Sequence, residues 1–145
     1  MGTPMGMKKN PDKKKKPLAR KKKTPRAKLI KKADKVFGDY MKAKAGRCEF
    51  CKDPKCKPLN VHHGVVHRRY MNTRYSEKNC VSVGVGCHYF LGNFPNQNME
   101  FFSKRIGSDG IEELEISARS GRKVSDQDLE EIIAKYERLL EGLVV

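Results

Sequence analysis

The residues of this chain best suited to chemistry are three histidines and an asparagine in a fixed order. His62 and His63 are adjacent, Asn79 follows them, and His88 comes next. An imidazole titrates near neutral pH, so it can take a proton from water or bind a divalent cation. Neighbouring residues on a strand point to opposite faces, so His62 and His63 are expected to do different jobs. If the strand is bent or ends here, we expect His63 to act as the base and His62 and His88 to hold a cation.

Two asparagines extend this candidate site. Asn79 is expected to fix either its loop or the ring of His63 through its side-chain amide, and Asn93 is a candidate third ligand or phosphate contact. A base, a cation and a group that orients the base are what hydrolysis of a phosphodiester requires. Ligand type does not choose among Mg2+, Mn2+ and Zn2+ for the catalytic ion. Two simpler interpretations stay open: the histidine pair only contacts phosphates, or His88 belongs to a structural metal site.

Five cysteines predict such a structural site. Cys48 and Cys51 have the two-residue gap with which thiolates clamp Zn2+, and Cys87 is the natural third ligand. The fourth is Cys56 or Cys80, or else water, and Cys56 is favoured slightly because it lies nearer the first pair. The odd count fits metal binding in a reducing compartment better than a disulfide framework. Ordinary reduced thiols, which are commonly buried, remain the alternative.

The formal net charge of +15 is unevenly distributed: residues 1–28 carry +11, residues 29–95 carry +8 and residues 96–145 carry −4. This predicts a polyanionic partner, in the first place nucleic acid. The proline-interrupted residues 1–28 cannot bury apolar area, so they are expected to be a disordered arm that binds phosphates without reading sequence. A solubilising tail or a nuclear localisation signal are the alternatives. The predicted nucleic-acid contacts are Lys13, Lys14, Lys15, Lys16, Arg20, Lys21, Lys22, Lys23, Arg68, Arg69 and Arg74.

The elements that must position these residues form a small α+β unit. Apolar spacing predicts a helix over 29–45, and two short strands are expected at 58–63 and 80–83. The polar, basic segment 64–78 between the strands is expected to have little regular structure. After a turn at Gly84-Val85-Gly86, a helix is expected to begin at Cys87.

Residues 96–145 are expected to be helical. One segment ends at Gly107, a second follows it, and Ser125 with Asp128 resembles a capping box that opens the last helix. The acidic, apolar-striped last helix either packs on its own domain or forms a homodimer. No apolar run of about 18 residues exists, so no membrane span is expected, and the N-terminus lacks the apolar stretch of a secretory signal. With 37% apolar residues and no Trp, the core must be modest, and small cores often need a metal.

Taken together, these residues resemble the His-Asn-His (HNH) nuclease superfamily and, within it, the NinG/Rap family of phage recombination proteins. The resemblance runs from about Arg47 to the C-terminus. It is carried by Cys48 and Cys51, His63, Arg74-Tyr75 before Asn79, Cys87, and Gly92-Asn93. Three positions depart from the family pattern: His88 stands where Asn is typical, His62 where Gly is common, and Gly84 where a cysteine is expected. The last departure concerns the zinc ligands rather than the catalytic residues.

The resemblance implies a zinc-stabilised ββα-metal core flanked by helices, with a knuckle and ββα motif over 46–95 inside a domain spanning 29–145. It also implies a metal-dependent DNA endonuclease that acts in phage recombination or replication, with branched DNA as a candidate substrate. Its implied cofactors are a structural Zn2+ and a catalytic divalent ion, and its implied location is the cytoplasm of a bacterial host. The rival interpretations are a non-catalytic zinc-binding nucleic-acid protein that keeps this fold, and an RNA-binding or ribosome-associated protein.

Overall fold

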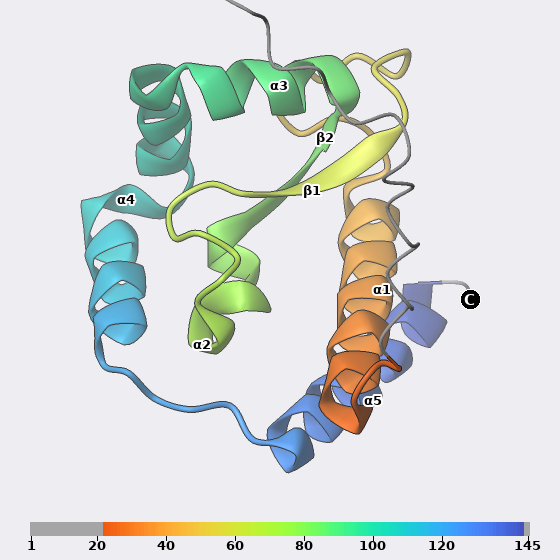
Figure 1. Ribbon diagram of the computed structural model, residues 1–145. Coiled ribbons are helices and arrows are strands. Elements are labelled where there is room, and N and C mark those ends of the chain that lie inside the picture. The colour runs from red at the N-terminus through yellow and green to blue at the C-terminus, as the bar shows by residue number, and fades with distance from the viewer. Residues whose placement is uncertain (1–21, 144–145) are drawn as a thin grey trace, which may run out of the picture.

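The computed structural model describes residues 22–143, and these form five α-helices around a two-stranded sheet (Figure 1). The first helix, α1, spans Pro25–Ala45 and begins four residues before the predicted start. Its start is set by Thr24, whose side chain accepts a hydrogen bond from the N–H of Ala27 at 3.1 Å. Gly46 ends it in the left-handed conformation, at φ 72°. The predicted arm is therefore shorter than 28 residues, because its last four belong to a helix.

The sheet is an antiparallel pair of five-residue strands, β1 (Leu59–His63) and β2 (Cys80–Gly84), close to the predicted ranges. In this register the first residue of each strand pairs with the last residue of the other. The connection between them is more regular than expected. It contains a short helix, α2 (Met71–Arg74), and a 3-10 turn over Glu77–Asn79. Mixed helix and sheet, the predicted α+β class, is confirmed.

Helix α3 (Val85–Asn93) follows β2 directly, so the predicted turn at 84–86 is wrong in extent: only Gly84 precedes the helix. Helix α4 (Pro95–Arg119) is interrupted at Gly107, whose φ of 75° and ψ of 167° are not helical. The predicted division of this region at Gly107 is confirmed as a kink within one long helix. In Figure 1, α1 and α4 stand on opposite sides of the hairpin, and α3 crosses above it.

The last helix, α5 (Asp126–Leu143), begins with the predicted capping box. The Ser125 hydroxyl accepts from the N–H of Asp128 at 3.1 Å, and the Asp128 carboxylate accepts from the N–H of Ser125 at 2.9 Å. Its apolar face packs on α1 and is buried there through Leu129, Ile133 and Tyr136. Of the two uses predicted for this apolar face, the structure shows packing on its own domain.

Two hydrophobic clusters share strand β2. Cys80 belongs to the cluster between α1 and α5, whereas Val81 and Val83 belong to the cluster against α3, α4 and the segment around Cys48. This alternation follows from the two-residue period of a strand. Both faces of the hairpin are thus covered by helices. Within residues 22–143, no helix combines the length and apolar character that a membrane crossing requires.

Candidate metal centre and histidine site

Four cysteines gather at the start of α3. The Sγ atoms of Cys48, Cys51, Cys56 and Cys87 all lie within 4.8 Å of one another. Zinc–sulfur bonds of about 2.3 Å in a tetrahedron place sulfurs about 3.8 Å apart, and the Cys56 and Cys87 sulfurs are 3.7 Å apart. The cluster therefore fits a structural zinc ion, and the preference for Cys56 is confirmed. Cys80 is buried in the other hydrophobic cluster, so its choice as an alternative ligand is wrong.

The glycine at the expected cysteine position explains how Cys56 enters the cluster. A Cβ atom built on Gly84 would lie 2.1 Å from the Sγ of Cys56 and 2.8 Å from its backbone C and O atoms. The φ of Gly84 is −66°, which any residue can adopt, so space and not backbone conformation requires glycine here. Cys56 occupies the space that a side chain at position 84 would fill. The fourth cysteine of the cluster therefore comes from another segment than the resemblance implies, and the glycine leaves the space for it.

The cluster also has the electrostatics of a metal site. Burial raises the pKa of Cys48, but backbone hydrogen bonds from Cys51, Gly84 and Phe50 outweigh it and lower that pKa to about 6. Burial raises the pKa of Cys87, which stays protonated at neutral pH without a metal. The thiolate is the form that binds zinc, so loading would start from the Cys48 thiolate and release a proton from Cys87.

His62 lies on the face of β1 covered by α3 and α4. Its Nε2 is 2.8 Å from the side-chain oxygen of Asn98, whose amide nitrogen donates to the Gly64 carbonyl at 2.8 Å. Because that amide nitrogen is engaged, the Asn98 oxygen must accept from His62, and the His62 proton sits on Nε2. Nδ1 is left with a free lone pair. The ring centroid of His88 is 5.2 Å from that of His62, so the structure brings these two predicted ligands together.

His63 points to the other face of the strand, toward α1. Its Nε2 is 2.9 Å from the backbone carbonyl oxygen of Arg74. A carbonyl only accepts, so Nε2 carries the proton and Nδ1 is free to accept one. Burial lowers the pKa of His63, and the nearby arginines add to this, so the ring is neutral near pH 7. The ring borders a cavity of about 150 Å³ between α1 and β1.

A carboxylate on α1 holds the segment that orients His63. Asp34 accepts two hydrogen bonds from the Arg74 guanidinium, at 2.8 and 2.6 Å, and one from the Tyr75 hydroxyl at 2.8 Å. Burial raises the pKa of Asp34, but these partners outweigh it and hold that pKa below its ordinary value. Arg74 was predicted to contact nucleic acid. Its side chain is only 11% exposed and is committed to Asp34, so we reassign it to positioning.

Asn79 fixes the loop that follows β1. Its side-chain oxygen accepts from the N–H groups of Val65 and Val66, at 3.2 and 2.7 Å, and its amide donates to the Val66 carbonyl at 2.9 Å. The side chain is fully buried. Of the two roles predicted for Asn79, the structure gives it the loop contact and no hydrogen bond to His63.

The other predicted site residues are dispersed. Asn93 is exposed, and its amide donates to the Tyr89 carbonyl at 2.7 Å; five residues beyond His88, it lies on another side of α3. Arg68 and Arg69 are exposed on the loop after β1, as Lys22 and Lys23 are before α1. The remaining predicted contacts lie outside the described residues: Lys13, Lys14, Lys15, Lys16, Arg20 and Lys21.

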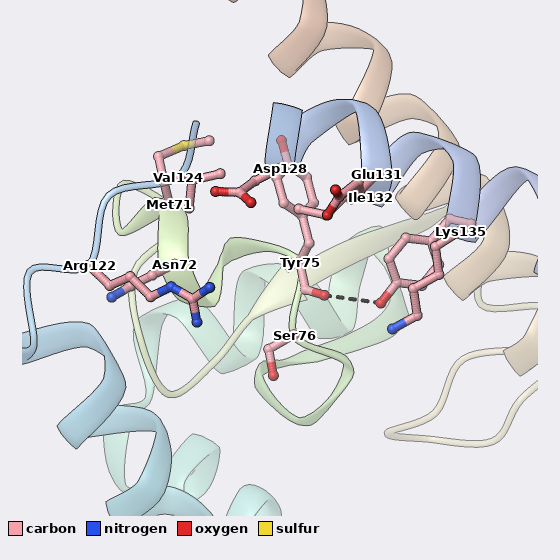
Figure 2. Close-up of a pocket in the computed structure, with 11 residues that line it drawn as sticks. Met71, Asn72, Tyr75, Ser76, Arg122, Val124, Asp128, Glu131, Ile132 and Lys135 are labelled. Carbon is pink, nitrogen blue, oxygen red and sulfur yellow. Dashed lines mark hydrogen bonds between the residues drawn. The ribbon is translucent and has the colours of Figure 1, made fainter. Parts of the chain in front are cut away.

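Sequence reasoning missed Asp34 and Asn98, which orient the two adjacent histidines. Asp34 acts on His63 through Arg74, which lies 40 residues later in the chain, and Asn98 contacts His62, which lies 36 residues earlier. Sequence reasoning also gave no sign of a cavity of about 380 Å³ between α2 and α5, which contains none of the predicted site residues. Figure 2 shows it around Tyr75, whose carbonyl accepts from the Tyr136 hydroxyl at 3.1 Å. Searches against family models, curated proteins and solved structures returned no match.

Proposed function

We propose that this protein is a metal-dependent DNA endonuclease of the His-Asn-His type, with a zinc-stabilised ββα core made of β1, β2 and α3. One observation carries the proposal. His62 on β1 and His88 on α3 stand with ring centroids 5.2 Å apart, and the next residue, His63, has its Nδ1 free to take a proton. Binding nucleic acid would not require two paired imidazoles on one face of β1 and, at the next residue where the strand ends, a third imidazole held in one tautomer.

In the proposed reaction, water attacks a backbone phosphorus and the Nδ1 of His63 takes its proton. A new oxygen–phosphorus bond forms, and the bond from phosphorus to a bridging oxygen breaks. The Arg74 carbonyl keeps His63 in the tautomer that leaves Nδ1 unprotonated. When bound by His62 and His88, a divalent cation supplies charge stabilisation for the phosphate and the leaving oxygen.

The remaining residues keep these groups in place. Asn98 fixes the His62 proton on Nε2, so Nδ1 is available as a ligand atom. Asn79 fixes the loop between β1 and α2, which carries Arg68 and Arg69 toward solvent as candidate phosphate contacts. A role in phage recombination or replication, with branched DNA as a candidate substrate, comes from the resemblance to the NinG/Rap family.

The second candidate is a non-catalytic zinc-binding nucleic-acid protein that keeps this core. It is favoured by the opposite orientation of His62 and His63: one ring faces α3 and α4, while the other contacts the loop beside α1. In this case the four cysteines and the basic surface carry the function, and the histidines only contribute to packing and phosphate contacts.

The two candidates are separated by replacing the proposed base. We expect His63→Ala to abolish cleavage of linear, nicked or branched DNA in the presence of Mg2+ or Mn2+, with zinc content and DNA affinity largely unchanged. The control is His67→Ala, which alters an exposed histidine on the following loop. Near-normal cleavage by His63→Ala would remove its role. No cleavage by the unaltered protein with any of these DNAs and metals would favour the non-catalytic candidate.

A further inference from the structure

A basic pocket is bordered by Cys48 of the cysteine cluster and by none of the histidines. It has a volume of about 290 Å³ and is formed by the end of α1, the segment from Arg47 to Lys52, the 3-10 turn and α4. Four cations line it, namely Lys44, Arg47, Lys52 and Arg105, against two carboxylates, those of Glu49 and Glu77. These six side chains carry a formal charge of +2, and Cys48, which also lines the pocket, reduces it to +1 as a thiolate.

The two carboxylates are already occupied. Glu77 pairs with Lys44 at 3.0 Å, and Glu49 pairs with Arg105 at 3.1 Å. Glu49 also accepts a hydrogen bond from the N–H of Ser82 at 2.6 Å, which ties it to the sheet. These two ion pairs connect the walls of the pocket. In the described part of the chain, the cations left without a paired carboxylate are Arg47 and Lys52.

Arg47 and Lys52 have no carboxylate within 4.0 Å among residues 22–143. Both side chains are exposed, and each directly adjoins one of the first two cluster cysteines. An arginine fork matches two oxygens of a phosphate, and a lysine beside it adds a point charge. The cavity has room for such a group, since a water molecule takes only about 30 Å³ of liquid.

We propose that this pocket binds a phosphate of duplex DNA, with Arg47 and Lys52 as its two ligands. The inference rests on the nucleic-acid part of the proposed function and not on cleavage. It names two contacts that composition alone does not single out among the 32 Lys and Arg residues of the chain. The inference also links DNA binding to the cysteine cluster, because a metal ion in the cluster would order the segment that carries Arg47 and Lys52.

The test is DNA affinity as a function of salt, measured by fluorescence anisotropy with a labelled duplex, full-length zinc-loaded protein and no added Mg2+ or Mn2+. Each phosphate contact contributes about 0.9 to the slope of log affinity against log salt. We expect Arg47→Gln/Lys52→Gln to reduce that slope by about 1 to 2. The control pair, Lys135→Gln/Arg138→Gln on α5, removes the same two charges from another surface and should leave the slope unchanged.

A second arm separates DNA phosphate from free phosphate. Inorganic phosphate, titrated at constant ionic strength, is expected to shift the NMR signals of Arg47 and Lys52 only at much higher concentration than the duplex does. Equal slopes for the test and control pairs would overturn the inference. So would a loss of zinc affinity in the test pair with an unchanged slope, because the two cations would then serve only to offset thiolate charge. If the protein binds through this pocket and never cleaves DNA, the inference stands and the endonuclease proposal fails.

Discussion

Replacing Gly84 by Ala tests how the cysteine cluster is assembled. The added methyl group would lie 2.1 Å from the Sγ of Cys56, where unbonded heavy atoms sit about 3.5–4.0 Å apart. To remove this overlap, the Cys56 sulfur must shift by about 1.5 Å. The backbone of Cys56, 2.8 Å from the new atom, is also too close, so rotation of the side chain alone does not remove the overlap. A sulfur displaced that far no longer reaches an ion about 2.3 Å from each ligand.

We therefore expect Gly84→Ala to destabilise the zinc-loaded protein by about 1–3 kcal/mol, the usual cost of overpacking, and to weaken zinc binding at least tenfold. Gly86→Ala is the matched control, because a Cβ at Gly86 would meet nothing within 4 Å. In the first turn of α3 that change should stabilise by about 0.5–1 kcal/mol through helix propensity and reduced freedom of the unfolded chain.

The assays are thermal unfolding with and without zinc, and competition for zinc with a chromophoric chelator. The expected outcome is a difference of sign between two Gly→Ala changes placed two residues apart. If Gly84→Ala binds zinc through four thiolates with unchanged affinity, Cys56 does not occupy the space next to position 84, and the account of the relocated ligand is refuted.

Three further predictions follow from other contacts. Asp34→Asn should destabilise by about 2 kcal/mol, as expected for a partly buried ion pair that loses one partner, whereas Asp39→Asn, on an exposed pair of α1, should change stability by less than about 0.5 kcal/mol. Because folding lowers the pKa of Asp34, its contribution to the free energy of unfolding is present above the unfolded pKa of about 3.9 and is lost as pH falls through the folded pKa. The unfolding curves of the variant and the unaltered protein should therefore converge below about pH 4. Deleting residues 1–21, which spares the Thr24 cap, should flatten the salt dependence of DNA binding; an unchanged slope would show that this arm makes no phosphate contacts. Cys51→Ser should weaken zinc binding and also binding of a second divalent ion, measured by calorimetry, whereas His88→Ala should weaken only the second.

Three of the four cluster cysteines give a local signal in the sequence, whereas Cys87 lies 31 residues beyond Cys56. Two cysteines three positions apart fix each other's geometry, and the adjacent thiol at Cys56 needed only a short loop to return. Proximity in sequence favoured Cys56 over Cys80, but the structural cause of that choice was not available from sequence. It depends on strand alternation, which sends Cys80 to the α1 face, and on the absence of a side chain at Gly84.

Of the predicted histidine-site residues, the structure brings His62 and His88 together and places Asn93 elsewhere on α3, and the residues that orient the histidines were not predicted. Asp34 and Asn98 come from helices that reach the hairpin only after the chain has folded, and no spacing rule connects them to His62 or His63. The prediction for Arg74 failed for the same reason. An arginine among other basic residues is expected to face solvent. The carboxylate that Arg74 contacts, Asp34, lies 40 residues earlier on α1, and no local pattern points to it.

The hairpin explains the positions of both the cysteine cluster and the buried asparagine. Two five-residue strands are marginal by themselves, so each end of the ribbon requires a restraint. At the end where β2 finishes, Cys56 packs against Gly84 and the cluster ties the approach to β1 to the start of α3. At the other end, Asn79 accepts from and donates to the loop that leaves His63. The histidines lie between these two restraints, and the neighbour of His88 on α3 is a cluster cysteine, Cys87. A loosened cluster would therefore displace His88 relative to His62, whereas truncation of the His88 side chain to Ala leaves the backbone that places Cys87 in α3.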